Sequence, residues 1–142
     1  MKILHVFDHT LPLHSGYTFR SAAILRNQQK MGWETFHLSG PKQINCSVME
    51  EDADGLHFYR TPKPTGLLAK LPGGDPFAVM GAIEARLLSL AKDLQPDVIH
   101  AHSPVLDAVP AIRVGRKLGI PVVYEIRAFW EDAAVDHGST KE

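Results

Sequence analysis

The sequence has few of the features that mark several large protein classes. Cys46 is the one cysteine among 142 residues, so no internal disulfide framework exists and a reducing compartment is expected. No apolar run approaches the ~20 residues of a membrane span, and the run at 3–7 is too short for a signal peptide. The formal net charge is −1, and no basic cluster is dense enough to indicate a nucleic-acid partner. We therefore expect a soluble, cytoplasmic protein.

Two motifs of nucleotide-binding and signalling domains are also missing. No G-x-G-x-x-G follows the first apolar run, which argues against a nucleotide-dependent oxidoreductase. Asp8 stands alone after that run, without the acidic pair of a receiver domain. The fold class must therefore be inferred from the periodicity of the chain.

Short apolar runs alternate with longer segments of helical period, which is typical of βαβ units and a parallel sheet. Strands are predicted at 3–7, 33–38, 56–60, 98–102 and 121–126, helices at 18–31, 75–94 and 104–118, and a polar, irregular segment at 39–55. The prediction is an α/β, Rossmann-like, doubly wound parallel sheet in strand order 3-2-1-4-5, with helices on both faces. One domain spans residues 1–142, and its ligands are expected where the carboxyl ends of the first and fourth strands diverge.

Apolar residues at helical spacing predict which face of each helix packs on the sheet. Gly32 is expected to end the first helix, and Asp75 with Pro76 to begin the second. The first helix is predicted to gather Phe19, Ala22, Ala23, Leu25 and Arg26 near one side, and the second to pack through Phe77, Met80, Ile83, Leu87, Leu90 and Leu94.

The loop 8–20 after the first strand carries the first candidate binding residues. Gly16 lets a ligand approach the backbone closely, and the free N–H groups of the following helix suit a phosphate or carboxylate. Arg20, one turn further, supplies a fork-shaped donor for the same anion. The alternative is a surface loop in which Ser15 or Thr18 caps the helix.

Polar residues also follow the fourth and fifth predicted strands. His100 and His102 share one face of a strand, which suits a metal pair or a ligand contact. We expect His100 to be a satisfied core histidine and His102 to face the cleft. Glu125 and Arg127 are expected to pair with each other, with other residues or with a ligand, because unpaired charges are costly to bury. Phe129-Trp130 is expected to make a hydrophobic contact rather than a sugar platform.

Four stretches of the sequence resemble one family of glycosyltransferases. They are Lys2-Ile3-Leu4-His5-Val6, Ser15-Gly16-Tyr17, Asp97-Val98-Ile99-His100-Ala101-His102-Ser103 and Ile120-Pro121-Val122-Val123-Tyr124-Glu125. The order and spacing of these four stretches make the chain similar to the N-terminal, acceptor-side domain of a GT-B enzyme of the retaining family 4 type. The stretch 124–132 is similar to the branch associated with exopolysaccharide and exosortase systems, which implies polysaccharide biosynthesis.

The resemblance implies sugar transfer, with retention, from a nucleoside diphosphate sugar to a hydroxyl of a sugar or lipid-linked acceptor. A C-terminal domain would bind most of the donor and carry two glutamates eight positions apart. No glutamate pair here has that separation, so the donor domain is expected to be absent and the chain alone inactive. Neither a cofactor nor a metal is expected, because helix N-termini and basic side chains would stabilise the diphosphate.

The resemblance also singles out particular residues, with two departures from the family. Ser15-Gly16 stands where many members have two glycines, and Arg127 where many have a histidine near the transferred sugar. Arginine is no base at neutral pH, but it can hold a hydroxyl or a phosphate. The candidate catalytic residues are His102, Glu125 and Arg127, and the candidate substrate-binding residues are Ser15, Gly16, Tyr17, Arg20 and Ser103.

A long excursion at 62–72 offers a place for membrane contact. Leu67, Leu68 and Leu71 would form an apolar lip for a lipid-linked acceptor or for the inner face of the membrane. The alternative is that these leucines pack against the domain.

Two other function classes remain open. A metal-dependent hydrolase would use His100 and His102 with His9 or His14, but no carboxylate bridge stands at a matching strand end. A stand-alone binding domain without catalysis would have the same fold.

Overall fold

The computed structural model describes residues 1–43, 48–65 and 75–127. The predicted apolar lip of Leu67, Leu68 and Leu71 and the aromatic pair Phe129-Trp130 lie outside these residues. The elements are β1 (Lys2–Phe7), α1 (Gly16–Lys30), β2 (Glu34–Ser39), β3 (Glu50–Ala53), β4 (Leu56–Arg60), α3 (Asp75–Leu94), β5 (Val98–His102), α4 (Val105–Leu118) and β6 (Val122–Glu125).

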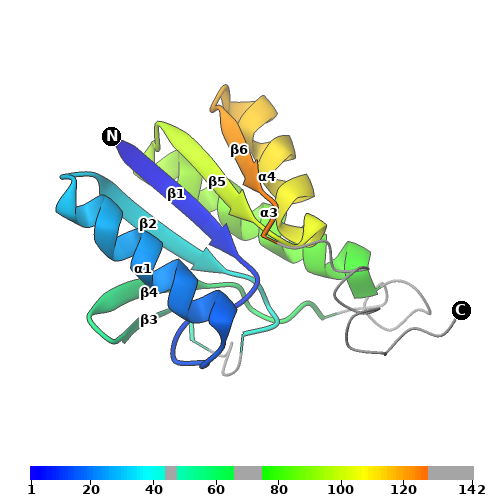
Figure 1. Cartoon of the computed structure of the whole chain (residues 1–142). Coiled ribbons are helices and arrows are strands. Elements are labelled where there is room, and N and C mark those ends of the chain that lie inside the picture. Colours follow the sequence, from blue (N-terminus) through cyan, green and yellow to red (C-terminus); the bar gives the residue numbers. More distant parts are fainter. Residues whose placement is uncertain (44–47, 66–74, 128–142) are drawn as a thin grey trace, which may run out of the picture.

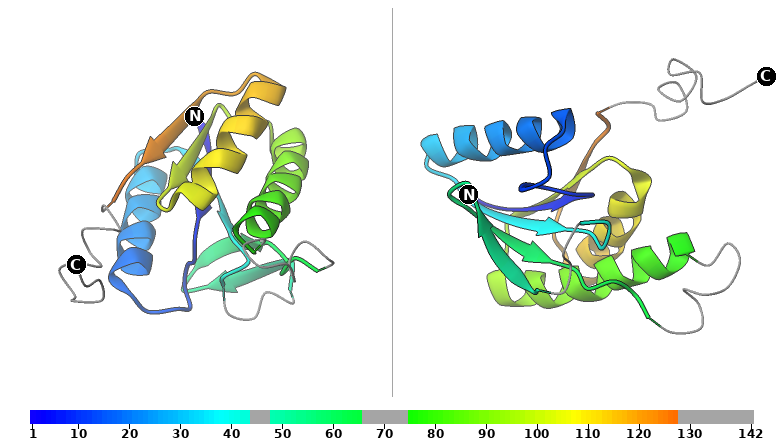
Figure 2. Two further views of the ribbon diagram at one scale, coloured as in Figure 1. Left: turned by 90° about the vertical axis from the view of Figure 1, so that its right-hand side faces the viewer. Right: turned by 90° about the horizontal axis from the view of Figure 1, so that it is seen from below.

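A six-stranded sheet with the order β3-β4-β2-β1-β5-β6 forms the centre of the fold (Figure 1). Strands β4, β2, β1, β5 and β6 run parallel in the predicted order, as right-handed crossovers on both sides of β1 require. α1 covers one face of this sheet, and α3 and α4 cover the other (Figure 2). The predicted doubly wound α/β fold is therefore confirmed.

Two buried apolar clusters hold the helices on the sheet. Leu4 and Val6 of β1 pack with residues of α3 and α4, and Phe7 packs with Leu25 of α1 on the opposite face. The predicted helix faces were partly wrong, because the large aromatic residues point outward: Phe19 is 55% exposed and Phe77 is 64% exposed. Ala23 and Arg26, also predicted on the packing side of α1, are exposed, whereas the predicted Ala22 and Leu25 are buried. Small side chains that were not predicted are buried as well, namely Thr18 and Ser21 of α1 and Ala78, Val79 and Ala91 of α3.

The strand β3 contradicts the prediction that 39–55 is irregular. It pairs antiparallel with β4 at one edge of the sheet, where its acidic side chains can remain solvated. Asp54 and Gly55 join the two strands with φ angles of 53° and 79°, which is the two-residue hairpin geometry that an Asp-Gly pair favours. The sequence therefore contained the hairpin signal, although β3 lacks the apolar alternation of a half-buried strand.

The hairpin also neutralises a buried arginine. The Arg60 side chain is fully buried, and its guanidinium lies 2.9 Å and 2.7 Å from Oε1 of Glu51 on β3. It also donates to Ser39 Oγ at 3.0 Å, to the Leu11 carbonyl at 2.7 Å and to the Thr10 hydroxyl. A buried charge needs a counter-charge and a full set of acceptors, and this one has both. Arg60 thereby fixes the loop after β1 to β2 and β4.

Asp107, in the first turn of α4, is buried without such partners. Its side chain is 1% exposed, and neither carboxyl oxygen has a hydrogen-bond partner. Burial, followed by the charge of Asp8, raises the pKa of Asp107 well above its ordinary range. Burial therefore disfavours the charged form of this carboxyl group.

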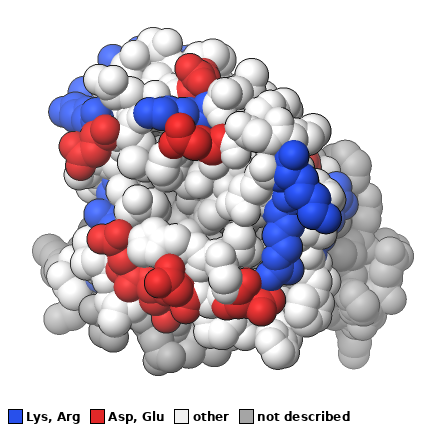
Figure 3. All heavy atoms as spheres, turned by 90° about the vertical axis from the view of Figure 1, so that its left-hand side faces the viewer, with Lys and Arg blue, Asp and Glu red and all other residues white. Residues whose placement is uncertain are grey.

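The surface carries charges of both signs. On the face drawn in Figure 3, acidic and basic side chains lie next to one another instead of forming a field of one sign. None of the helices in the described part of the chain has the length and apolarity needed to cross a bilayer.

The contact between α4 and the turn before β6 gives a first prediction. A Cβ on Gly115 would lie 2.6 Å from the Ile120 carbonyl oxygen and would also collide with Val122. We expect Gly115→Ala to destabilise the protein by about 1–3 kcal/mol. On α3, a Cβ on Gly81 meets nothing within 4 Å, so Gly81→Ala should be neutral or stabilising by up to about 1 kcal/mol. Urea denaturation measures both, and equal stability of the two variants would contradict this packing.

Asp107 gives a second prediction, about pH. The pKa of Asp107 is higher in the folded chain than in the unfolded chain, where it is about 4. As pH rises from about 4 to the raised pKa, the unfolded chain therefore loses this proton more readily, and the free energy of unfolding falls. Asp107→Asn removes that ionisation. We therefore expect the free energy of unfolding of Asp107→Asn, relative to wild type, to increase between pH 5 and pH 8. A difference independent of pH in denaturant titrations would show that Asp107 is not held neutral.

Candidate functional site

The carboxyl ends of β1, β5 and β6 lie side by side at the end of the sheet where ligands were predicted. His5 of β1 pairs in register with His100 of β5, and His102 pairs with Glu125 of β6. Since neighbours in register share a face, the three histidines lie together on the face that α1 covers. The His100 and His102 rings are 4.1 Å apart, and the His5 and His102 rings 5.2 Å apart.

Four side chains on this face form a continuous hydrogen-bonded row. Oε1 of Gln28, on α1, lies 2.8 Å from Nε2 of His5. Nδ1 of His5 lies 2.9 Å from Nε2 of His102, and Nδ1 of His102 lies 2.9 Å from Nη2 of Arg127. Burial is the main cause that lowers the pKa of His5 to about 3 and the pKa of His102 further below its ordinary value. Both imidazoles are therefore neutral at physiological pH.

Arg127 is the point where this row reaches the strand ends. Its side chain is 7% exposed, and its guanidinium carbon lies 4.1 Å from the ring centre of Tyr17, a cation–π contact. Nη1 donates to the Tyr17 carbonyl oxygen at 2.9 Å, and Nε lies 3.5 Å from Glu125 Oε2. Burial lowers the pKa of Arg127, but a guanidinium keeps its charge in proteins.

Glu125 is the acidic centre of the site. Its side chain is 27% exposed and lies 3.4 Å from both Arg20 Nη2 and His100 Nε2. The prediction that Glu125 and Arg127 pair with each other and with further residues is confirmed. Glu125 and Arg20 are the more open members of the cluster, since the Arg20 side chain is 57% exposed.

Two predictions about the histidines were wrong. His102 is fully buried and does not face solvent, because both its ring nitrogens bind His5 and Arg127. His100 is not a satisfied core histidine: its side chain is 16% exposed, and among the described residues Nε2 has no hydrogen-bond partner, although it lies close to Glu125. The alternation rule placed both rings on the correct face, but it could not show which ring the other elements cover.

Tyr17 and Ser103 join the elements of the site. The Tyr17 hydroxyl donates to the Ser103 carbonyl at 2.7 Å and accepts from the Asp8 N–H at 3.0 Å. Ser103 Oγ donates to the Glu125 carbonyl at 3.2 Å and accepts from the Arg127 N–H at 2.8 Å. These polar atoms are engaged within the chain, and they hold β5 and β6 in place beside the first loop.

Ser15 forms a capping box at the start of α1. Its hydroxyl accepts from the Thr18 N–H at 3.2 Å, while the Thr18 hydroxyl accepts from the Ser15 N–H at 3.0 Å. The alternative interpretation of this loop, in which Ser15 or Thr18 caps the helix, is therefore borne out for Ser15, which is the N-cap. Gly16 follows at the first position of α1, and a Cβ there would meet nothing within 4 Å. The chain itself does not crowd Gly16, so the backbone there is open to a ligand.

His5, His100 and His102 are also the side chains that could hold a metal ion. Each offers a ring nitrogen, and these atoms lie within 4.8 Å of one another. A metal must lie near the ring plane of every histidine that binds it. The His100 and His102 planes are inclined by only 16° and are stacked, so they do not converge on a common point. This arrangement suits hydrogen bonding rather than shared coordination.

Buried atoms without hydrogen-bond partners gather at the same place. In the described ranges they include His100 Nε2, Arg127 Nε and both carboxyl oxygens of Asp107. All lie on β5, on α4 directly after it, or just beyond β6. Such atoms are uncommon in folded proteins, and their concentration here marks this edge as the candidate functional site.

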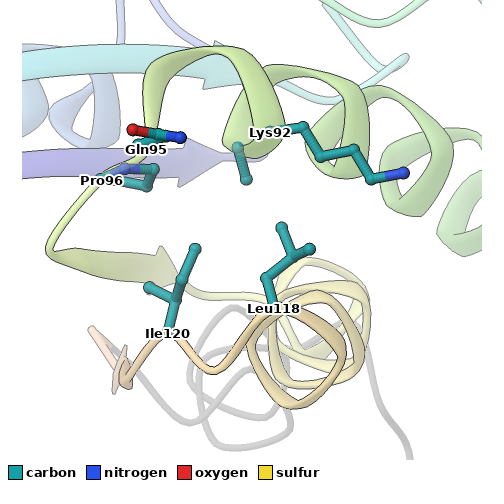
Figure 4. Close-up of a pocket in the computed structure, with 6 residues that line it drawn as sticks. Lys92, Gln95, Pro96, Leu118 and Ile120 are labelled. Carbon is teal, nitrogen blue, oxygen red and sulfur yellow. The ribbon is translucent and has the colours of Figure 1, made fainter.

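A hollow of about 300 Å³ lies at the opposite end of the sheet (Figure 4). It lies between the C-terminal ends of α3 and α4, and its lining comprises Ala91, Lys92, Gln95, Pro96, Leu118 and Ile120. Lys92 is the one titratable side chain of this lining, so the hollow lacks the facing polar groups that catalysis requires.

The chain is similar to several known proteins. The chain is 23% identical over 124 residues to a GDP-mannose-dependent alpha-mannosyltransferase of Mycolicibacterium smegmatis, covering 87% of this chain and 31% of that protein. Among solved structures, MurG of Acinetobacter baumannii matches with a TM-score of 0.63 and 17% identity, over 96% of this chain and 38% of MurG.

A UDP-GlcNAc 2-epimerase from Neisseria meningitidis, bound to UDP-GlcNAc, has a similar fold with a TM-score of 0.57 and 19% identity. The match covers 87% of this chain and 31% of the epimerase. Because an epimerase shares this fold, the fold alone does not decide the reaction. The chain thus spans about a third of the length of the proteins it matches. A family model described as glycosyl transferase 4-like domain matches residues 15–142. The chain belongs to the glycosyl transferase 4-like domain family.

Proposed function

We propose that this chain is the acceptor-side domain of a retaining glycosyltransferase that uses a nucleoside diphosphate sugar. The observation that carries the proposal is the cluster of Arg20, Glu125 and Arg127 at the carboxyl ends of β5 and β6, in a member of this family. In doubly wound folds, ligands bind at this edge of the sheet.

The reaction would break the bond between the anomeric carbon and the diphosphate and form a bond from that carbon to an acceptor oxygen, while the proton of the acceptor hydroxyl would pass to the leaving diphosphate. Glu125 is open enough to accept a hydrogen bond from the acceptor hydroxyl, and Arg20 and Arg127 offer positive charge to the leaving diphosphate. His102 is buried behind Arg127, so it would act by orienting Arg127 rather than by touching the substrate.

A second domain, supplied by a longer protein, would close this site. The chain covers 31% of the mannosyltransferase and 38% of MurG, which supports a full enzyme with a separate donor-binding domain. Binding between two domains would orient both substrates and exclude water. We place the enzyme in polysaccharide biosynthesis, in the cytoplasm at the inner face of the membrane, with a sugar or lipid-linked acceptor.

Two alternatives have less support. The stacked geometry of His100 and His102 disfavours a metal-dependent hydrolase, because those rings cannot share an ion as they stand. A stand-alone binding domain would have the same fold, but it would not require the unpartnered buried groups at the strand ends.

The direct test is to sequence the reading frame beyond the Glu142 codon and to assay its whole product with labelled nucleoside diphosphate sugars. We expect the sugar to be transferred. We expect Arg127→Ala to lower kcat/KM at least about 100-fold, which is the effect of removing one hydrogen-bond donor that stabilises charge in a transition state. Arg113→Ala is the matched control, since Arg113 forms an exposed pair with Glu84 on α3. A native stop at Glu142, or an Arg127→Ala enzyme as active as wild type, would contradict the proposal.

Gly16 tests whether an anion approaches the start of α1. Gly16→Ala is expected to leave stability unchanged or to raise it by up to about 1 kcal/mol, because the new Cβ meets no atom and alanine favours helix. We expect the same variant to bind inorganic pyrophosphate more weakly, as measured by isothermal titration calorimetry. Equal affinity in the two proteins would show that no anion lies against Gly16.

A further inference from the structure

The hydrogen-bonded row from α1 to the strand ends has a direction that chemistry fixes. A guanidinium can only donate, so His102 Nδ1 must accept from Arg127 with a lone pair. The proton of neutral His102 is then on Nε2, and it is donated to Nδ1 of His5. His5 in turn carries its proton on Nε2 and donates it to the Gln28 side-chain oxygen.

The Gln28 end of the row is compatible with this direction, because a glutamine can turn its side-chain oxygen toward His5. A proton on His5 Nε2 needs an acceptor beside it, and the side-chain oxygen of Gln28 occupies that place at 2.8 Å. Every ring nitrogen of His5 and His102 has one partner of the correct kind. Reversing any one member would place two donors or two acceptors face to face in a buried environment, which is costly.

We propose that Gln28 and His5 are positioning residues that set the orientation of Arg127 through the tautomer of His102. If His102 carried its proton on Nδ1, that proton would point at Arg127 Nη2, which now lies 2.9 Å away. The guanidinium would then lose this acceptor and could leave its place over Tyr17. Gln28 thus controls a group at the strand ends that it does not touch.

The remaining contacts of Arg127 explain why it depends on this row. Nη1 is held by the Tyr17 carbonyl, but Nε has no hydrogen-bond partner and lies 3.5 Å from Glu125. His102 therefore provides the contact that fixes the second terminal nitrogen. The link to sugar transfer rests on the proposed function, whereas the tautomers and the orientation of Arg127 do not.

The primary experiment is long-range ¹H–¹⁵N NMR of the histidine side chains in the 142-residue chain. In wild type we expect His5 and His102 to be neutral and protonated on Nε2. Nδ1 protonation of His102 in wild type would overturn the proposal without any variant.

Variants then test the role of Gln28. Gln28→Leu removes the acceptor, so we expect His102 to show mixed tautomers and the Arg127 side-chain N–H signals to broaden. Gln28→Glu keeps an acceptor oxygen and should retain the wild-type signals. Gln29→Leu is the matched control, because the neighbouring Gln29 is exposed and donates only to Thr35. An unchanged His102 tautomer in a folded Gln28→Leu protein would overturn the proposal, since a packing role alone predicts that result.

Activity separates this proposal from the proposed function. In the whole enzyme, we expect Gln28→Leu to lower kcat by about 10–100-fold, the range seen when other orienting hydrogen bonds are lost, and Gln28→Glu to restore it. The expected tautomers in a protein without transferase activity would support the row and contradict the proposed function. Sugar transfer by an enzyme in which Gln28→Leu leaves the His102 tautomer unchanged would support the proposed function and contradict the role of Gln28.

Discussion

The site depends on matching every donor to an acceptor in a buried, polar layer beneath α1. His5 and His102 are buried on the sheet, and their neutral rings remain satisfied because Arg127 and Gln28 supply the two ends of the row. Most α/β sheets fill this layer with aliphatic side chains. Here the layer joins α1, β1, β5 and the residues after β6 by directional contacts, so the place of each element restricts the others.

Two buried arginines hold the first loop and the start of α1. Arg60 binds Thr10 and the Leu11 carbonyl from β4, and Arg127 binds the Tyr17 carbonyl from the end of β6. The loop between β1 and α1 and the start of α1 are therefore fixed by contacts within the chain, and the open backbone at Gly16 begins that helix. A preorganised loop loses less entropy on binding than a mobile one, which favours recognition.

The sequence predicted the parallel sheet and its order because apolar runs, helix-ending glycines and crossover rules are local or general signals. It missed β3, whose acidic residues form an edge strand, although Asp54-Gly55 was a usable hairpin signal. The candidate site was predicted through Glu125 and Arg127, which are close in sequence. His5 was missed because it lies 97 residues from His102 in the sequence, and Gln28 was missed because it is linked to His102 only through His5. No spacing pattern in the sequence reveals such contacts.

The imidazoles in this layer are inferred to be neutral and to act as directional connectors. The most direct test is an NMR titration of the wild-type histidines from pH 8 to pH 5. His5 and His102 should remain unprotonated throughout, because burial lowers the pKa of each, to about 3 for His5. His57 is an internal reference that should gain a proton, since the hydrogen bonds that its ring donates to the Glu50 and Asp52 carboxylates raise its pKa above the ordinary value. Protonation of His102 with a midpoint near 6.5, the ordinary value, would contradict the account.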